Sequence, residues 1–446
     1  MRFDCIHCRK ATTKPQSVKG AFLRMLTIKI GCKNLLYNSL SDCFALAENT
    51  IINAIRNKDI HSIENSVSST ISTLKQGGFI IDDETNEQNI LENLIKKIDY
   101  NENEFILTVN PTMNCNLKCW YCYENHQGNM YMSSTIVQYI QKFITKKVLE
   151  THGIKRFYLG FFGGEPFLCF NSVIMPLITH YIKVCKTKNI PPYISFTTNG
   201  TLLNKEKIDK LIESTNNLSF QITLDGCKED HDSIRNLPNQ SSYDVILRNI
   251  NLLINKKCYV TLRINYTHKN ISNLSSIIND LSSMPYEYRK YLYLDFQQIW
   301  QDASKYNLKD KINIVYEYAI KNKINISSNN FDRVRKSCYA DKKNQAIINY
   351  NGDVFKCTAR DFLHEKRYGY LNELGEIIWD TPLLTQRMQS KFSNTSCQAC
   401  RIAPLCSGNC SQVRIEKNNN NYCILNYDEN KKDSIILSRF ENKYKI

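Results

Sequence analysis

The fold and the chemistry of this chain are indicated by one short stretch, Cys115-Asn116-Leu117-Lys118-Cys119-Trp120-Tyr121-Cys122. Three thiolates on so short a loop can hold three irons of a cubane cluster, which leaves the fourth iron open to a substrate or cofactor. The alternative is a zinc knuckle, but such a site needs four ligands in paired C-x-x-C form. The residues before the loop, Phe105-Ile106-Leu107-Thr108-Val109, predict a buried strand. The loop therefore follows the carboxyl end of a strand, where α/β barrels place their chemistry.

From residue 105 onward, strand-like and helix-like segments alternate. Further apolar, strand-like runs cover residues 157–159, 194–196, 218–224, 260–264 and 292–296. Between the strand-like runs, counted from the first at 105–109, lie helix-like stretches near residues 134–149, 172–187, 204–214, 243–255 and 271–282. This alternation predicts a parallel sheet with right-handed crossovers, and six β/α units are too few to close an eight-stranded barrel. We therefore expect an α/β fold, an open, partial (β/α)6 TIM-like barrel over residues 105–305.

The regions outside the barrel have different patterns. Residues 1–104 contain a strand-like run at 35–40, helix-like stretches at 43–57 and 61–76, and a short strand after Gly77-Gly78. They predict a small N-terminal α+β module of the winged-helix kind. We expect this module to be separable, so that a chain without it keeps its metal sites. Residues 306–337 predict a helical linker, and residues 431–446 a charged helix or frayed tail.

Composition places the chain among soluble globular proteins. It has 446 residues with 42% hydrophobic and 23% charged, which suggests two to four domains. No apolar run approaches ~20 residues and the start of the chain lacks a signal-peptide pattern, so we expect a cytoplasmic protein without a membrane partner. The net charge of +15 is not gathered in an Arg-rich or Lys/aromatic stripe. It indicates a general Lys and Asn bias, and we expect no nucleic-acid partner.

The chain contains eighteen cysteines, which in a reducing compartment favours metal binding or catalysis over structural disulfides. Eight are scattered along the sequence: Cys5, Cys8, Cys32, Cys43, Cys169, Cys185, Cys227 and Cys258. From Cys169 onward these are expected to be small core residues. Cys5 and Cys8 have the spacing of half a metal site, which is too little to assign a role. The remaining ten fall into two groups.

Polar turns follow the next strands of the predicted barrel. Gly163-Gly164-Glu165-Pro166 comes after the second strand, Thr197-Thr198-Asn199-Gly200 after the third, and Thr223-Leu224-Asp225-Gly226 after the fourth. Glycines allow a ligand to approach the backbone, and carbonyl groups at a strand end can accept hydrogen bonds from an ammonium group. Taken alone, each segment could equally be an ordinary tight turn. Together they predict a polar rim beside the cysteine loop.

The cysteine loop, the Gly163–Pro166 turn and the six β/α units together resemble the radical S-adenosylmethionine (SAM) enzymes, over residues 105–305. The resemblance implies a [4Fe-4S] cluster on Cys115, Cys119 and Cys122, whose free iron binds SAM. Reductive cleavage of SAM then yields a 5′-deoxyadenosyl radical. The other implied cofactor contacts are Tyr121 near the adenine, Gly163, Gly164 and Glu165 near the methionine ammonium group, and Thr223 and Arg235 near the ribose and carboxylate.

The second group of cysteines resembles the SPASM extension of the same superfamily, here over residues 338–430. The resemblance implies two auxiliary [4Fe-4S] clusters, and hence three in all. The first would be held by Cys338, Cys357 and Cys410. The second would be held by Cys397, Cys400, Cys406 and Cys423. Fully ligated members have an eighth cysteine before the position of Cys338. This chain has none there, which leaves an open iron or a non-cysteine ligand such as Asp332.

The resemblance implies a peptide maturase that forms a thioether or carbon–carbon cross-link in a ribosomally made peptide. Its partners would be a precursor peptide with a leader, bound by the N-terminal module, and an electron donor such as flavodoxin or ferredoxin. Sulfatase maturases carry an Asp where this chain has Thr358, which argues against sulfatase maturation. The alternatives are a radical SAM dehydrogenase of a small molecule or protein side chain, and a non-catalytic iron–sulfur electron carrier. No catalytic acid or base is assigned.

Overall fold

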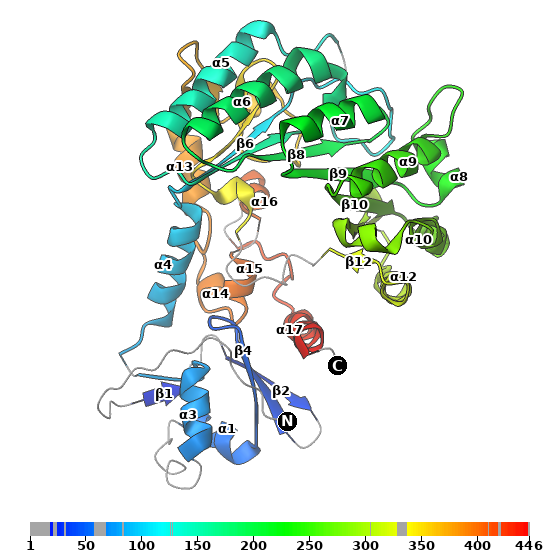
Figure 1. Cartoon of the computed structure of the whole chain (residues 1–446). Helices are drawn as coiled ribbons and strands as arrows, with labels where there is room; N and C mark the ends of the chain where they lie inside the picture. The colour runs from blue at the N-terminus through cyan, green and yellow to red at the C-terminus, as the bar shows by residue number, and fades with distance from the viewer. Residues whose placement is uncertain are drawn as a thin grey trace. The chain divides into compact units, whose positions relative to one another are not determined.

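A computed structural model describes most of the chain. The described residues are 18–20, 25–30, 33–57, 68–82, 84–124, 126, 128–303, 305–327, 337–408, 410–417 and 421–444. The chain divides into two compact units, whose elements are labelled in Figure 1. The barrel unit comprises residues 102–328 and 344–384. The cysteine-rich unit comprises residues 1–101, 329–343 and 385–446. Cys5, Cys8, Cys32 and Asp332 lie outside the described residues.

The barrel unit is built on a parallel sheet whose spatial order follows the chain. Its six central strands are β6 (Glu104–Val109), β7 (Arg156–Phe161), β8 (Tyr193–Thr198), β9 (Leu218–Leu224), β10 (Tyr259–Tyr266) and β11 (Leu292–Gln298). Each pairs in parallel with the next, and a short β12 (Asn325–Ile326) continues beyond β11. The strand order is linear, so the sheet does not close within the described residues. The open α/β architecture expected from the sequence is confirmed.

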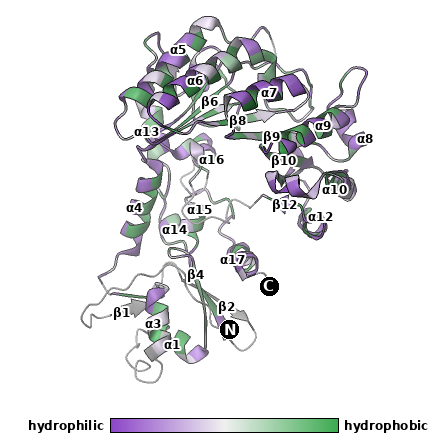
Figure 2. Ribbon diagram, in the orientation of Figure 1, coloured by the Kyte–Doolittle hydropathy of each residue, from purple (hydrophilic) through white to green (hydrophobic). Residues whose placement is uncertain are grey.

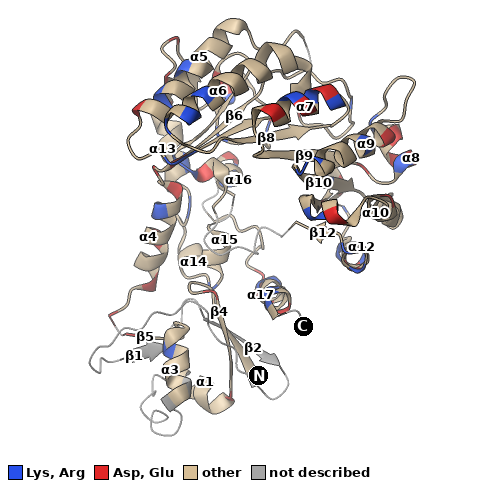
Figure 3. Cartoon of the chain, viewed as in Figure 1, with Lys and Arg blue, Asp and Glu red and all other residues tan. Residues whose placement is uncertain are grey.

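Helices connect these strands close to the expected positions. They are α5 (Ser134–Thr145), α6 (Met175–Thr187), α7 (Lys205–Ser214), α8 (Lys228–Ile234), α9 (Ser242–Asn255), α10 (Leu274–Ser282), α11 (Trp300–Ala303) and α12 (Lys309–Lys321). Ser133, Asn204 and Ser241 cap three of them by accepting a backbone N–H of the first turn. Acidic and basic residues alternate along α7 (Figure 3). Within this helix, Lys205 Nζ lies 2.5 Å from Asp209 Oδ2.

The sheet has an apolar face and a polar face, because successive side chains of a strand point to opposite sides. Phe161, Phe196 and Phe220 stack on the apolar face, with ring centroids 5.3 and 5.0 Å apart in sequence, and belong to the core covered by the helices. Figure 2 shows these apolar strands together with helices whose surfaces are partly hydrophilic. The alternate positions include Thr197, paired in register with Gln221, and are available for a functional site.

One helical stretch in the described residues, Pro166–Thr187, is long and apolar enough to span a membrane by length and composition. It begins with two short helical turns (η2, Pro166–Cys169; η3, Phe170–Ile174) and ends with α6. Leu177, Ile178 and Tyr181 are completely buried in the core of the barrel unit. Its apolar composition is therefore explained by packing against the sheet.

Part of the region expected to form the SPASM domain belongs to the barrel unit. β13 (Gln345–Ile348) pairs in parallel with β6, and β14 (Asp353–Phe355), β15 (Gly369–Leu371) and β16 (Ile377–Trp379) continue the same sheet in antiparallel order. All four residues of β13 are buried. This strand covers the edge of β6, whose backbone groups would otherwise be unpaired. The compact unit therefore extends past the expected boundary at 305 to include residues 344–384.

The cysteine-rich unit contains two small antiparallel sheets. β1 (Val18–Gly20) pairs with β5 (Ile80–Asp82), and β2 (Met25–Ile30), β3 (Lys33–Asn38) and β4 (Cys43–Ala47) form a three-stranded sheet. The helices of this part are α1 (Asn49–Arg56), α3 (Ser68–Gln76) and α4 (Glu87–Asp99). The expectation of one helix over 43–57 was therefore wrong for its first five residues. Pairing with β3 overrides their local preference, because Phe44 and Ala47 are buried on that sheet.

The N-terminal sheet shares a hydrophobic core with the C-terminal helices of the same unit. These are α14 (Thr395–Gln398), α15 (Ala403–Cys406), α16 (Ser411–Glu416) and α17 (Glu429–Tyr444), and they follow α13 (Thr381–Gln389). Tyr37 and Phe44 pack with Leu405 of α15 and Phe440 of α17. Asp42 adds a 2.7 Å ion pair with Arg439 of α17. Residues 1–101 therefore belong to the same compact unit as residues 385–446, and the tail forms a helix, one of the two forms expected for it.

Candidate functional site

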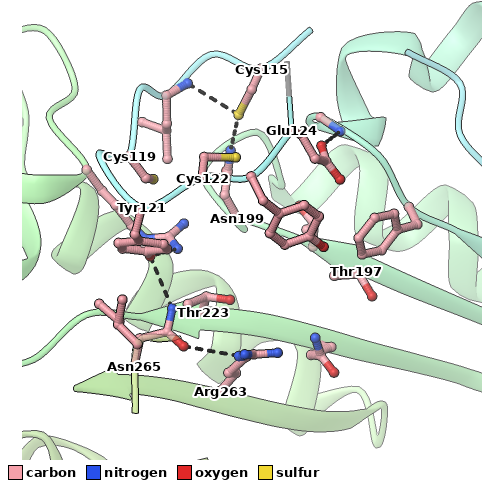
Figure 4. A pocket seen from close by; sticks show the side chains of 18 of the residues that line it. Cys115, Cys119, Tyr121, Cys122, Glu124, Thr197, Asn199, Thr223, Arg263 and Asn265 are labelled. Carbon is pink, nitrogen blue, oxygen red and sulfur yellow. Dashed lines mark hydrogen bonds between the residues drawn. The ribbon is translucent and has the colours of Figure 1, made fainter. Parts of the chain in front are cut away.

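The three cysteines of the first group line one cavity of about 200 Å³ in the barrel unit (Figure 4). The cavity lies at the carboxyl ends of the parallel strands, as expected from the position of the cysteine loop. It is also lined by five of the cofactor contacts that the family resemblance implies: Tyr121, Gly163, Gly164, Thr223 and Arg235. Residues separated by more than 100 positions in sequence are thus brought to one site.

The Gly163–Pro166 turn holds the cysteine loop at both ends. The Glu165 amide donates to the Asn114 carbonyl oxygen at 2.8 Å, just before the loop. The Gly164 amide donates to Oε2 of Glu124 at 2.6 Å, just after it. Gly164 has a φ of +50°, and a Cβ there would lie 2.2 Å from the Asn114 oxygen. A glycine is required at this position because two backbones pack together, a reason additional to the ligand approach expected from the sequence.

Glu165 itself is completely buried and does not line the cavity. Its carboxylate accepts hydrogen bonds from Thr198 Oγ1 at 2.7 Å, the Asn199 amide at 2.8 Å and the Phe167 amide at 3.0 Å. Burial raises the pKa of this carboxyl, although these hydrogen bonds oppose the rise. Asn199 in turn donates from Nδ2 to Cys115 Sγ at 3.7 Å. In this structure Glu165 therefore positions a neighbour of a cysteine, and its expected contact with an ammonium group stays a prediction.

Tyr121 and Arg235 are held by one buried network. The Tyr121 hydroxyl donates to Asp225, at 2.6 Å from Oδ2, and accepts from Arg235 Nη2 at 2.7 Å and Asn265 Nδ2 at 3.1 Å. Arg235 Nε also binds Asp225 Oδ2 at 2.5 Å. Burial alone would lower the pKa of Arg235, but the facing Asp225 carboxylate holds it well above its usual value. The network fixes the cysteine loop to β9, α8 and β10.

A neutral histidine is hydrogen-bonded to the same network. Nδ1 of His231, in α8, accepts a hydrogen bond from the Asp225 amide at 3.1 Å. The His231 side chain is completely buried, and burial lowers its pKa to about 4. The ring is therefore uncharged near neutral pH, which is the state in which Nδ1 can accept.

Several lining residues were not singled out from the sequence. Arg263 and Asn265 lie on β10, where Arg263 Nε donates to Asn265 Oδ1 at 3.0 Å (Figure 4). Trp300 stacks on Tyr123 with ring centroids 5.9 Å apart. Arg263 could have been found, since it continues the alternation of polar residues on the free face of the sheet. Burial raises the pKa of Glu124, another unexpected lining residue, to about 7.

The donor set of the cavity fits a thiolate-bound cluster. Cys115 Sγ accepts hydrogen bonds from the Leu117 amide at 3.4 Å and from Asn199, and Cys122 Sγ lies 3.2 Å from His126 Nε2. Among the residues that the structure describes, no three His, Cys, Asp or Glu side chains are grouped to hold one metal ion. A cubane cluster does not need such a group, because its ligands bind different irons. Cys169, Cys185, Cys227 and Cys258 are buried, which confirms them as core residues.

The cysteines of the second group are distributed over both units. Cys357 follows β14 in the barrel unit. The other six lie in the cysteine-rich unit: Cys338, Cys397, Cys400, Cys406, Cys410 and Cys423. Cys397 and Cys400 lie close together, because the Cys400 amide donates to the Cys397 carbonyl oxygen at 3.2 Å.

Three comparisons relate the chain to known proteins. Residues 109–281 match the family described as the Radical SAM superfamily. A cysteine-type anaerobic sulfatase-maturating enzyme from Clostridium novyi is 26% identical over 326 residues, which cover 67% of this chain and 85% of that protein. The crystal structure of Streptococcus suis SuiB bound to S-adenosylmethionine is similar in fold, with a TM-score of 0.52 and 17% identity over 90% of this chain and 97% of SuiB. SuiB bound to the precursor peptide SuiA gives the same TM-score, at 16% identity over 91% of this chain and 98% of SuiB.

Proposed function

Because this chain is a radical SAM superfamily enzyme, we propose that it modifies a ribosomally made peptide by a thioether or carbon–carbon cross-link. The observation that carries the proposal is the shared cavity of Cys115, Cys119 and Cys122, with polar groups along its rim. When bound, the [4Fe-4S] cluster and SAM supply reductive cleavage and a 5′-deoxyadenosyl radical that abstracts hydrogen from the substrate. The protein residues hold these groups, orient the substrate and exclude water.

The lining residues provide contacts of the right chemical type for SAM. Tyr121 offers an aromatic face near the adenine, and Thr223 and Arg235 offer a hydroxyl and a cation near the ribose and carboxylate. Gly163 and Gly164 expose backbone near the methionine ammonium group. Tyr121 and Arg235 are already fixed by Asp225, so binding SAM costs little side-chain entropy at these positions.

The second group of cysteines would hold two auxiliary [4Fe-4S] clusters, with the ligand sets given by the SPASM resemblance. They would take up or relay the electron that remains after cross-linking. The first auxiliary cluster has three cysteines, so its fourth iron can bind a substrate thiolate or another ligand. A metal-bound thiol is deprotonated and held in place, which favours a cysteine-containing peptide and a thioether product.

A leader-bearing precursor peptide is the proposed partner. The sheet β2–β3–β4 supplies edges to which a leader can add as a further strand. The precursor peptide bound to SuiB supports a peptide as the first substrate class to test. Thr358 stands where sulfatase maturases carry an Asp, so a sulfatase is the less favoured substrate. Flavodoxin or ferredoxin would supply the electron.

The test is anaerobic turnover of the iron-reconstituted protein with SAM and a reductant. We expect release of 5′-deoxyadenosine and, with the right peptide, loss of two hydrogen atoms from its mass. Replacing Cys115, Cys119 and Cys122 by Ala should abolish both and remove about four of about twelve irons. The matched control replaces the buried core cysteines Cys185 and Cys258. Continued 5′-deoxyadenosine release by the triple variant would overturn the cluster assignment.

The other two functions predict different products. A dehydrogenase would release 5′-deoxyadenosine but leave a small molecule or a protein side chain oxidised, with no new cross-link. A non-catalytic electron carrier would bind no SAM and release no 5′-deoxyadenosine. The three-cysteine loop favours a SAM enzyme, because an open iron serves ligand binding and has no use in simple electron transfer.

A further inference from the structure

Arg414 is a buried cation in the cysteine-rich unit. It lies in α16 and is 2% exposed. Within the described part of the chain it has no Asp or Glu partner at ion-pair distance. Its Nε atom is buried and has no hydrogen-bond partner among the described residues. A buried guanidinium group without a counter-charge is strongly destabilising.

The groups that Arg414 does contact are neutral oxygens and one sulfur. Nη2 donates to Cys397 Sγ at 3.8 Å, to the Gly408 carbonyl at 3.1 Å and to the Tyr422 carbonyl at 3.4 Å. Nη1 donates to the Ser390 carbonyl and, at 3.3 Å, to Ser393 Oγ. Gly408 and Tyr422 stand close in sequence to Cys410 and Cys423. One side chain thus connects three cysteine-bearing segments.

Other buried cations of the same unit do have carboxylate partners. Arg387 Nη1 lies 3.9 Å from Asp341 Oδ1, and Lys432 Nζ lies 2.5 Å from Glu429 Oε1. Arg414 is therefore the exception among them. The anion nearest to Arg414 would be the sulfur of a cysteine thiolate. Arg414 contacts Cys397 Sγ and the carbonyl oxygen of Tyr422, which directly precedes Cys423. Four thiolates on a [4Fe-4S] cluster carry net negative charge, and a hydrogen bond or charge beside the sulfurs changes the reduction potential of the cluster.

We propose that Arg414 is the buried counter-charge of the auxiliary cluster held by Cys397, Cys400, Cys406 and Cys423. The inference rests on the proposed auxiliary clusters. Arg414 positions the segments that carry the ligands and favours the reduced cluster, because reduction adds one negative charge beside a fixed positive one. Arg414 is a positioning residue, and its role is electrostatic as well as structural.

The test compares Arg414→Met and Arg414→Lys with the matched control Arg387→Met, a buried arginine of the same unit. All three are made in the background that lacks Cys115, Cys119 and Cys122, so that only auxiliary clusters remain. Iron content and redox titration followed by electron paramagnetic resonance are the readouts. In Arg414→Met, one auxiliary signal should shift to a more negative potential or about four irons should be lost. Because Arg414→Lys keeps the positive charge, its iron content and reduction potentials should stay closer to those of the parent protein.

A second readout is the thermal stability of the iron-free protein. Arg414→Met should raise its melting temperature, since an uncompensated buried charge is removed, whereas Arg387→Met should lower it. The same Arg414→Met change should lower the stability of the reconstituted protein. If Arg414→Met keeps its full iron content and its auxiliary reduction potentials do not shift, the proposed role of Arg414 is wrong. That result would leave the proposal of auxiliary clusters unaffected. A wild-type protein that binds only about four irons would overturn the auxiliary clusters and this inference with them.

Discussion

The two cysteine regions of this chain are held in place by different means. The loop of Cys115, Cys119 and Cys122 is hydrogen-bonded at both ends to the Gly163–Pro166 turn. Tyr121 of the loop is also hydrogen-bonded to Asp225. The cysteines of the cysteine-rich unit lie on short helices and turns such as α14 and α15, each of four residues. Its buried Arg414 has no carboxylate partner in the part of the chain that the structure describes. The first site is preorganised by protein contacts, whereas we propose that the second depends on a bound cluster for its charge balance.

The largest expected effect is on the cysteine-rich unit when residues 1–100 are deleted. The deletion removes Tyr37 and Phe44 from the core shared with α15 and α17, each worth about 1.5–3 kcal/mol, and breaks the Asp42–Arg439 pair. We expect loss of about eight auxiliary irons, rapid proteolysis of residues 385–446, and a barrel unit that keeps about four irons. Iron analysis and limited proteolysis measure this. Retention of all irons would show that the cysteine-rich unit does not need the shared core.

The second prediction tests the clamp on the first site. Gly164→Ala places a Cβ 2.2 Å from the Asn114 oxygen at a positive φ, and should cost about 4–5 kcal/mol of unfolding free energy. Gly128→Ala is the matched control, because its φ is +85° but no atom of the described residues lies within 4 Å of the added Cβ. It should cost about 1–2 kcal/mol from backbone strain alone. Denaturant unfolding of the two variants separates the steric clash from the backbone strain. Equal losses of unfolding free energy would show that the close packing of Gly164 against Asn114 does not require a glycine.

The third prediction concerns the Asp225 network. Asp225→Asn leaves Arg235 buried without a counter-charge and should cost about 3 kcal/mol of stability. Adding Arg235→Met should recover part of this loss, because the uncompensated charge is removed. A double-mutant cycle with chemical denaturation gives the coupling energy. Additive losses from the two changes would show that the ion pair does not stabilise the site.

The smallest predicted effect is a pH dependence in the barrel unit. His231 has a pKa of about 4 in the folded protein, below its ordinary value of about 6.5, so folding favours the neutral ring. His231 therefore contributes about 2–3 kcal/mol to the free energy of unfolding. This contribution is complete above pH ~6.5 and is lost as the pH falls toward 4. Unfolding of the iron-free protein at several pH values measures the slope. His231→Gln should flatten it in this range, and an unchanged slope would assign the dependence to other groups.

The parallel sheet and the cysteine cavity could be predicted because they rest on local patterns. Alternating apolar strands and amphipathic helices dictate β/α units, and a three-cysteine loop after a buried strand dictates where the chemistry lies. Even Arg263 could have been found, because period-two alternation places polar residues on the free face of the strands. The family resemblance predicts Arg235 at the site, but its pairing with Asp225 depends on how α8 packs.

What the sequence by itself determined is therefore the element order, the position of the cysteine loop and the two groups of cysteines. Tertiary structure alone decided which distant segments share a core. Pairing converted residues 43–47 from an expected helix into β4, and joined β13 to the barrel sheet. It also made Glu165 a buried positioning group and placed Arg414 where no described carboxylate pairs with it. Each of these outcomes depends on burial and on contact partners, some of which lie hundreds of residues away in the sequence. A local sequence pattern therefore cannot predict them.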